Sequence, residues 1–223
     1  MSLDIDPGLL KPVVTKKAKK EAEKAAKNQN VSSATHRMTE RHFMRRASSE
    51  QMLNETLDWH FEDGNSYHTI SQGDIDSLTF LRAVVKQQKI DYMLISTWCM
   101  AVTDAEEVHS WLERGLVKRV DFYVGEIFQG SYAPVYEYIK KNCIVDGARL
   151  AIFRNHSKIM AGFGERFDFA IESSANVNTN PRAEQTTICV DRGLARFYKD
   201  WFDGIKAFNR DFDDWYPWEV KNG

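Results

Sequence analysis

The 223-residue chain lacks most of the features that mark a secreted, zinc-binding or membrane-spanning protein. Its three cysteines are far apart and form no Cys-x-x-Cys pair, so neither a disulfide framework nor a zinc site is predicted. No apolar run approaches the roughly twenty residues that a transmembrane helix needs, and we find no apolar signal run. We therefore expect a cytoplasmic protein with reduced thiols and no stable membrane association.

Two further absences bear on the chemistry. The sequence has no glycine-rich phosphate loop, and its six histidines show no metal-ligand spacing. We therefore expect no metal site and no cofactor. The net charge of −2 favours no class of partner, although residues 11–27 hold seven lysines against two glutamates.

The first third of the chain predicts segments without a core of their own. Residues 1–32 form a Lys-rich tail with helix-forming residues but no apolar stripe, which indicates a flexible segment or a solvated helix. Residues 33–73 are predicted as a helical extension, with arginines near helical spacing. These basic side chains either contact nucleic-acid phosphates or form a solvated surface. The candidate phosphate contacts are Lys16, Lys17, Lys19, Lys20, Arg41 and Arg45.

Residues 74–223 are predicted to form one α/β domain. Amphipathic helical patterns alternate with apolar strand patterns, and this alternation favours parallel pairing with crossover helices. The predicted helices are 74–88, 103–114, 131–141 and 194–208, and the predicted strands are 90–97, 119–126, 149–160, 167–173 and 186–191. We therefore expect a mixed, mostly parallel sheet flanked by helices on both faces.

Two of these strands are predicted to form a hairpin that carries the candidate site. Gly162 and Gly164 mark the turn between them. His156 and Lys158 are two residues apart, so on a strand their side chains point to the same face. If the strands pair, Asn176 lies near the His156 end.

An imidazole, an ammonium and a carboxamide facing one point suit phosphoryl transfer. A neutral histidine is a nucleophile or an acid/base, and lysine and asparagine donate hydrogen bonds to the non-bridging oxygens of a phosphodiester. A His-x-Lys pair alone is a weak signal. The strand-turn-strand context and the polar residues that end the second strand make it informative.

The segment from His156-Ser-Lys158 to Ser174-Ala-Asn176 resembles the HKD motif of the phospholipase D superfamily, which runs His-x-Lys, Asp, then Gly-Ser-x-Asn. Phe163 stands at the position of the motif's Asp, and Ser173 at that of its Gly. The resemblance implies a phospholipase D-like fold and metal-independent phosphodiester cleavage. The residues to which it assigns catalytic roles are His156, Lys158, Asn176, Glu184 and Ser174.

The resemblance also implies the role of each residue. His156 attacks phosphorus and forms a phosphohistidine, Lys158 and Asn176 hold the non-bridging oxygens, and Ser174 supports the site. Glu184 accepts a hydrogen bond from Nδ1 of His156. With one motif in the chain, the second histidine is expected from another copy, as in the homodimeric members of the family.

These implications lead to an endonuclease that acts on DNA or RNA. Two alternatives remain open. One is a non-catalytic nucleic-acid-binding or assembly protein on the same fold, because a fold does not guarantee activity. The other is a phospholipid phosphodiesterase, which the single motif and the lack of a membrane anchor disfavour.

Overall fold

The structure is a computed structural model that describes residues 47–55, 57, 60–145, 147–178, 182–209 and 215–220. The chain divides into two units, residues 1–45 and 46–223, and all described residues belong to the second. The predicted tail at 1–32 and all six candidate phosphate contacts lie outside the described residues. Residues 47–55, within the predicted helical extension, are helical.

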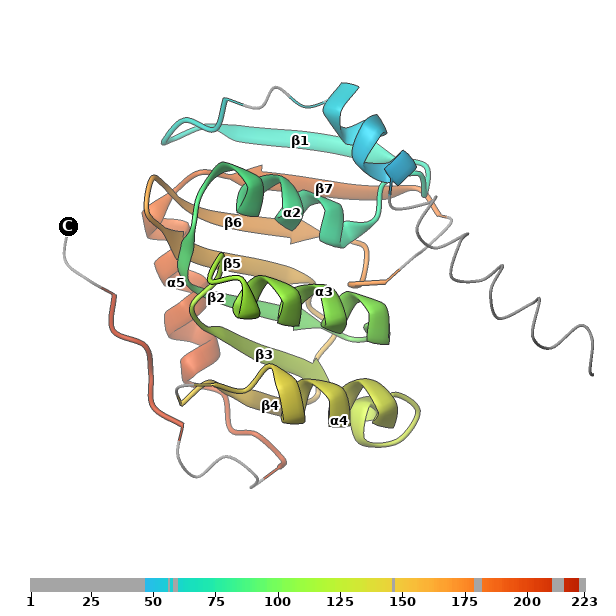
Figure 1. Ribbon diagram of the computed structural model, residues 1–223, viewed down its shortest axis with the longest axis vertical. Coiled ribbons are helices and arrows are strands. Elements are labelled where there is room, and N and C mark those ends of the chain that lie inside the picture. Colours follow the sequence, from blue (N-terminus) through green and yellow to red (C-terminus); the bar gives the residue numbers. More distant parts are fainter. Residues whose placement is uncertain are drawn as a thin grey trace, which may run out of the picture. The chain divides into compact units, whose positions relative to one another are not determined.

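The described residues form one seven-stranded sheet in the order β1-β7-β6-β5-β2-β3-β4 (Figure 1). The strands are β1 Ser66–Ser71, β2 Ile90–Thr97, β3 Val120–Gly125, β4 Leu150–Phe153, β5 Ile159–Gly164, β6 Asp168–Ser173 and β7 Glu184–Cys189. Strand β1 at the sheet edge was not predicted, because its alternation of exposed and half-buried residues contains few apolar side chains. The mixed α/β class is as predicted.

The share of parallel pairs is lower than predicted, so "mostly parallel" was wrong. The pairs β2–β3 and β3–β4 are parallel, whereas β1–β7, β7–β6, β6–β5 and β5–β2 are antiparallel. Parallel neighbours need a long crossover, and here helices α3 and α4 provide it. The later strands follow one another through short connections, which favour antiparallel pairing.

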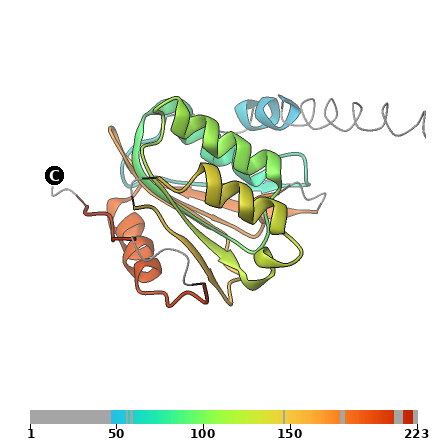
Figure 2. The same ribbon diagram turned by 60° about the horizontal axis from the view of Figure 1, so that its bottom comes forward.

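Helices cover both faces of the sheet, as predicted. The described helices with assigned bounds are α2 Ser77–Gln87, α3 Val102–Glu113, α4 Ala133–Asn142 and α5 Arg192–Asp203, with a short 3₁₀ helix η2 at Glu126–Gln129. Helices α2, α3 and α4 lie on one face and α5 lies on the other (Figure 2). Each face of the sheet therefore has its own apolar layer.

Strand β2 shows how the sequence builds both layers at once. Met93 and Ile95 belong to the core under α2, α3 and α4, while Tyr92 and Leu94 belong to the core under α5. All four are fully buried. A strand buried on both faces reads as a continuous apolar run, which is why its bounds were predicted correctly from the sequence.

One predicted strand, residues 149–160, is in fact two strands in different parts of the sheet. Strand β4 pairs with β3, whereas β5 pairs with β2 on its other side. The connection at residues 154–158 therefore crosses the carboxyl ends of β3 and β2 before β5 turns back along β2. It carries His156 and Lys158, so both residues lie on a crossing loop rather than on a strand.

Candidate functional site

Three chain segments meet at the end of the sheet where β2 and β3 finish, which we call the carboxyl edge. Strand β5 starts there after the crossing loop, β6 ends there at Ser173, and β7 starts there at Glu184. The backbone N–H of Ser173 donates to the carbonyl of Lys158 at 3.0 Å, which joins the loop to the end of β6. The antiparallel pairing of β5 with β6 confirms the predicted hairpin, but the predicted turn was wrong: Gly162 and Gly164 lie in β5 and the turn falls at residues 165–167. The pairing brings all five candidate residues to this end of the sheet.

His156 and Lys158 lie side by side, as their spacing predicted. The Nζ atom of Lys158 is 3.1 Å from Nδ1 of His156, and it also donates to the carbonyl oxygen of His156. His156 is exposed and Lys158 half-buried. The ring of Trp98 packs beside the imidazole, with centroids 5.6 Å apart. Attached to one short loop, the two side chains reach the same region of solvent.

Burial lowers the pKa of Lys158, while the nearby Cys99 thiol and Glu184 carboxylate raise it by a smaller amount. A partly dehydrated ammonium interacts more strongly with an anion than a fully solvated one does. A bound phosphate would therefore stabilise the charged form of Lys158, which burial disfavours.

Asn176 is fixed by its own side chain after β6 ends. Its Oδ1 accepts a hydrogen bond from the backbone N–H of Trp98 at 3.3 Å. With Oδ1 engaged in this way, Nδ2 is the atom of this side chain that can donate to an anion. Trp98 thus contacts two candidate residues: its backbone binds Asn176 and its ring packs on His156.

Ser174 and Glu184 form a pair across the β6–β7 connection. The Ser174 hydroxyl donates to Glu184 Oε2, and the same hydroxyl accepts from the backbone N–H of Gln185 at 3.0 Å. Glu184 also acts electrostatically on Lys158. Ser174 therefore contacts Glu184 directly, while its expected supporting role stays a prediction. The expected bond from Nδ1 of His156 to Glu184 remains a prediction, since Nδ1 lies against Lys158 here.

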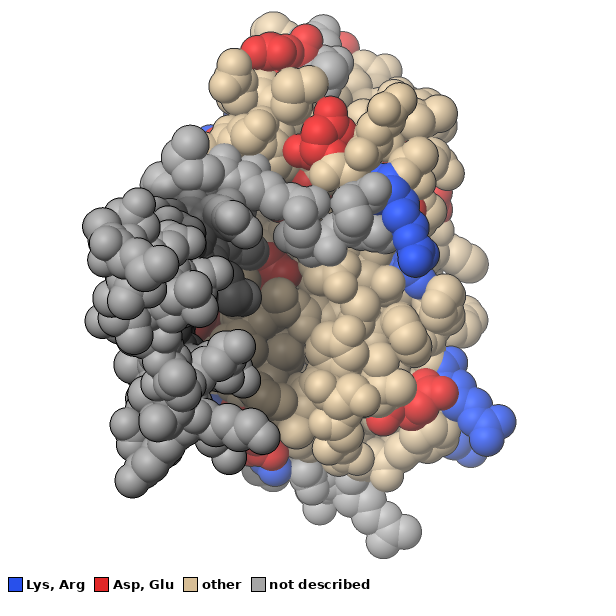
Figure 3. Space-filling model, turned by 90° about the vertical axis from the view of Figure 1, so that its right-hand side faces the viewer, with Lys and Arg blue, Asp and Glu red and all other residues tan. Residues whose placement is uncertain are grey.

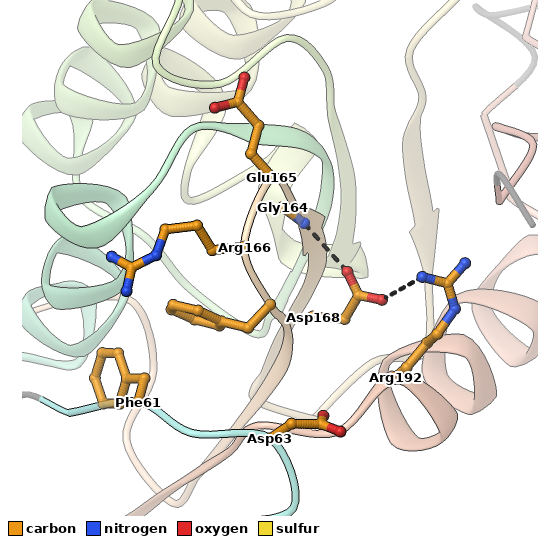
Figure 4. Close-up of a pocket in the computed structure, with 8 residues that line it drawn as sticks. Phe61, Asp63, Gly164, Glu165, Arg166, Asp168 and Arg192 are labelled. Atoms are coloured by element: carbon orange, nitrogen blue, oxygen red, sulfur yellow. Dashed lines mark hydrogen bonds and ion pairs between the residues drawn. The ribbon is translucent and has the colours of Figure 1, made fainter. Parts of the chain in front are cut away.

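At the other end of the β5–β6 hairpin, Phe163 fills the position of the motif's aspartate with an apolar ring. It is buried in the core under α5 and packs on Trp218, with ring centroids 5.3 Å apart. A different aspartate, Asp168, stabilises the turn by accepting from Gly164 N at 3.3 Å and from Arg192 at 3.0 Å (Figure 4). The turn is therefore stabilised by a carboxylate from β6.

The same turn borders a cavity of about 460 Å³. Figure 4 shows Arg166 and Arg192 on its sides, with Asp168 directed toward Arg192. The length of β5 separates this cavity from His156. Its two arginines already pair with the protein: Arg192 binds Asp168 and Arg166 donates to Gln87 O at 2.9 Å. The cavity is therefore distinct from the site at the carboxyl edge.

Figure 3 faces the edge at which β2, β3 and β6 end. Most of the described surface there is uncharged, and the Lys and Arg side chains in view lie toward its margin (Figure 3).

No group of three or more His, Cys, Asp and Glu side chains could hold a metal ion within the described residues. Among the helices that the structure describes, none combines the length and apolar character needed to cross a membrane. His68 and His109 lie away from the site, in contact with Thr187 and Tyr138 respectively.

The sequence pattern missed Trp98 and Asn155. Trp98 directly follows β2, and no motif in the sequence marks it as part of the site. Asn155 precedes His156 and is 4% exposed, with its side chain directed into the sheet edge. A buried polar residue next to a candidate nucleophile is a signal that the sequence alone does not display.

Comparison with known proteins identifies no family for this chain. No protein-family model matches the chain, and no curated protein matches its sequence. Solved structures with a similar arrangement include NucT from Helicobacter pylori, at 14% identity and a TM-score of 0.48, with 62% of this chain and 94% of that chain covered.

Two others match with a lower identity and a lower TM-score. TrmBL2, an archaeal chromatin protein described with a mode of DNA binding, matches at 11% identity and a TM-score of 0.44, over 79% of this chain and 66% of its own. Phosphatidylserine synthase from Haemophilus influenzae Rd KW20 matches at 13% identity and a TM-score of 0.42, with 62% of this chain and 37% of that chain covered. At these values the function must be argued from the site's own residues.

Proposed function

We propose that this chain is a metal-independent phosphodiesterase, an endonuclease that cleaves DNA or RNA through a phosphohistidine at a site shared by two copies. One observation supports it above all. Lys158 Nζ lies 3.1 Å from Nδ1 of His156, and the pairing of β5 with β6 brings Asn176, up to twenty residues away in the sequence, to the same end of the sheet. Such a set matches the needs of a phosphodiester under nucleophilic attack.

In the first step, Nε2 of His156 attacks phosphorus and forms a P–N bond. The P–O bond to the leaving nucleoside breaks, and its electron pair stays on the leaving oxygen. A second histidine, protonated beforehand, donates its proton to that oxygen. In the second step, this histidine takes a proton from water, whose oxygen attacks phosphorus while the P–N bond breaks. His156 is regenerated and the phosphomonoester is released.

Lys158 and Asn176 stabilise the charge that builds on the non-bridging oxygens in both steps. Preorganised donors in a partly dehydrated site favour the transition state more than donors in bulk water do. These two side chains supply the stabilisation that a metal ion supplies in other phosphodiesterases.

Glu184 and Ser174 complete the site in this proposal. When Lys158 moves from Nδ1 to a phosphate oxygen, Nδ1 becomes the nitrogen that carries the proton and donates to the Glu184 carboxylate. This leaves Nε2 with the lone pair that attacks. The hydrogen bond from Ser174 holds Glu184 in place for this role.

The second histidine is the reason for proposing two copies. In-line displacement needs a nucleophile and an acid on opposite sides of phosphorus, and the chain offers one His-x-Lys set. A two-fold axis through the carboxyl edge would place His156 of the second copy opposite the first. Because such an interface is self-complementary, it closes as a dimer.

The direct test is incubation of the purified chain with single- and double-stranded DNA and RNA, with and without EDTA. We expect cleavage that survives EDTA and is lost in His156→Ala at unchanged thermal stability. Binding of nucleic acid without cleavage by the wild-type chain would instead support the non-catalytic alternative. Strict dependence on a divalent metal ion would contradict the proposed mechanism.

A further inference from the structure

A closed ring of three side-chain hydrogen bonds lies directly beneath the His156 loop. Nδ2 of Asn155 donates to Ser96 Oγ at 2.9 Å, and the hydroxyls of Ser96 and Ser157 are 2.6 Å apart. Ser157 Oγ returns a hydrogen bond to Asn155 Oδ1 at 2.6 Å. Each hydroxyl therefore donates once and accepts once around the ring, an arrangement in which neighbouring hydrogen bonds strengthen one another.

The ring is anchored to two strands. Nδ2 of Asn155 also donates to Tyr123 O on β3 at 2.7 Å, and Thr97 O of β2 lies 3.4 Å from the same nitrogen. These carbonyl oxygens only accept, so the amide must face them with its nitrogen. Asn155 Oδ1 also accepts from the backbone N–H of Ser157 at 2.9 Å. The side chain thus ties the loop to the ends of both strands.

Alternation along the loop directs the ring inward and the reactive groups outward. Asn155 is 4% exposed and Ser157 half-buried, whereas His156 is exposed and its Nδ1 meets Lys158 Nζ. Fixing residues 155 and 157 therefore fixes the backbone from which the side chains of 156 and 158 project.

The loop packs closely against the end of β3 because residue 125 is a glycine. A Cβ atom at Gly125 would come within 3.3 Å of Asn155 O and within 2.8 Å of Trp98 Cδ1. A glycine here thus allows both the loop and the tryptophan that packs on His156 to lie close to the strand end.

We propose that Asn155 is a positioning residue: with Ser96 and Ser157 it sets the orientation of His156 and Lys158 so that both face one phosphate. This inference rests on the proposed function for its catalytic consequence, but the orientation of His156 is measurable without turnover. Asn155 does not touch the reacting atoms. Its effect is transmitted through the loop backbone.

The test replaces the amide by a carboxylate of the same shape. Asn155→Asp removes both donors and places an acceptor against Tyr123 O and Ser96 Oγ, which breaks the ring. The matched control is Asn209→Asp, because Asn209 also donates to a strand carbonyl, Leu150 O at 2.7 Å, at a place away from the site. Ser157→Ala is a milder second variant that opens the ring at one hydroxyl.

The readout is the histidine ring NMR signal of His156, assigned by its loss in His156→Gln. We expect Asn155→Asp to shift this signal and Ser157→Ala to shift it less, while Asn209→Asp leaves it unchanged. In cleavage assays, Asn155→Asp should lower kcat on the order of a hundredfold with little change in KM, as expected for a misplaced nucleophile.

The possible results separate the two proposals. An inactive wild-type chain whose His156 signal still responds to Asn155→Asp would overturn the proposed function and leave the positioning role intact. An unchanged His156 signal in Asn155→Asp would overturn the positioning role, whatever the activity. If Asn155→Asp does not fold, the same judgement is made on Ser157→Ala, in which an unchanged His156 signal would overturn the role.

Discussion

Lys158 Nζ lies 3.1 Å from Nδ1 of His156, the nitrogen that would carry the proton in the proposed attack by Nε2. A neutral imidazole that accepts from an ammonium at Nδ1 carries its proton on Nε2, where it has no free lone pair. We infer that a phosphate, by drawing the ammonium onto its oxygens, also frees Nδ1 and activates the nucleophile. Substrate binding and activation are thereby coupled through one side chain.

The first prediction concerns the pH range of activity. Burial lowers the pKa of Lys158, and the ammonium form is the one that holds phosphate. Activity should therefore fall on the alkaline side at a pH below the ordinary lysine pKa of about 10.4. In Lys158→Arg, whose guanidinium stays charged, this alkaline limb should move upward, even if kcat is lower. A pH–rate profile of both proteins checks this, and coincident alkaline limbs would count against the assignment.

The same pKa shift makes a prediction about stability. Because the folded state binds this proton less tightly than the unfolded state, Lys158 opposes folding at pH values below its folded pKa. The penalty disappears as pH rises through that pKa toward the unfolded value. Lys158→Met should therefore raise the melting temperature at pH 7 while removing activity. A melting temperature lower than that of the wild type at pH 7 would contradict this sign.

Asn176 should act as a donor and not only as a structural residue. Asn176→Asp replaces the donor by an anion that repels phosphate, so cleavage should fall by about a hundredfold or more. The control is Asn178→Ala, since Asn178 donates to the Cys99 sulfur at 3.2 Å on the same segment. Equal losses in the two variants would show that the segment matters only for folding.

The Lys-rich tail is tested by deletion of residues 1–30. We expect the domain to remain folded, because residues 46–223 form a compact unit separate from residues 1–45. If the lysines contact phosphates, the deletion weakens nucleic-acid binding and flattens the dependence of the binding constant on salt. If the salt dependence of the binding constant is unchanged, the lysines of the tail form a solvated surface and do not contact phosphates.

The shared site predicts a homodimer, which light scattering or analytical ultracentrifugation detects. A mixed dimer of wild-type and His156→Ala chains has one nucleophile and no opposite histidine, so it should form at most the covalent intermediate and fail to turn over. A monomer that cleaves with normal kcat would require an acid from within the same chain.

The strands of this fold were predictable where burial is strong. Strand β2 is buried on both faces and its bounds at Ile90 and Thr97 follow from its apolar run. The sequence did not distinguish β4 from β5, because the loop between them contains a buried Asn155 and keeps an alternating pattern. The prediction of parallel pairing is right for β2, β3 and β4, which helices connect. It is wrong for β5, β6 and β7, which shorter connections join as antiparallel neighbours.

The candidate site was predictable as a set of residues but not as a geometry. His156, Lys158 and Asn176 were recognised from spacing, and pairing of β5 with β6 brings them together. The supports came from distant segments: Ser96 lies in β2, and Trp98 follows it. Contacts between residues sixty to eighty positions apart depend on strand order, which local patterns do not encode.

The central claim is that His156 forms a covalent bond to phosphorus. The most direct measurement is mass spectrometry of the chain quenched during cleavage of an oligonucleotide and digested under conditions that preserve phosphohistidine. We predict a nucleotidyl or phosphoryl adduct on the peptide that contains His156, absent from His156→Ala. A wild-type enzyme that cleaves without this adduct, together with turnover by His156→Ala, would contradict the account.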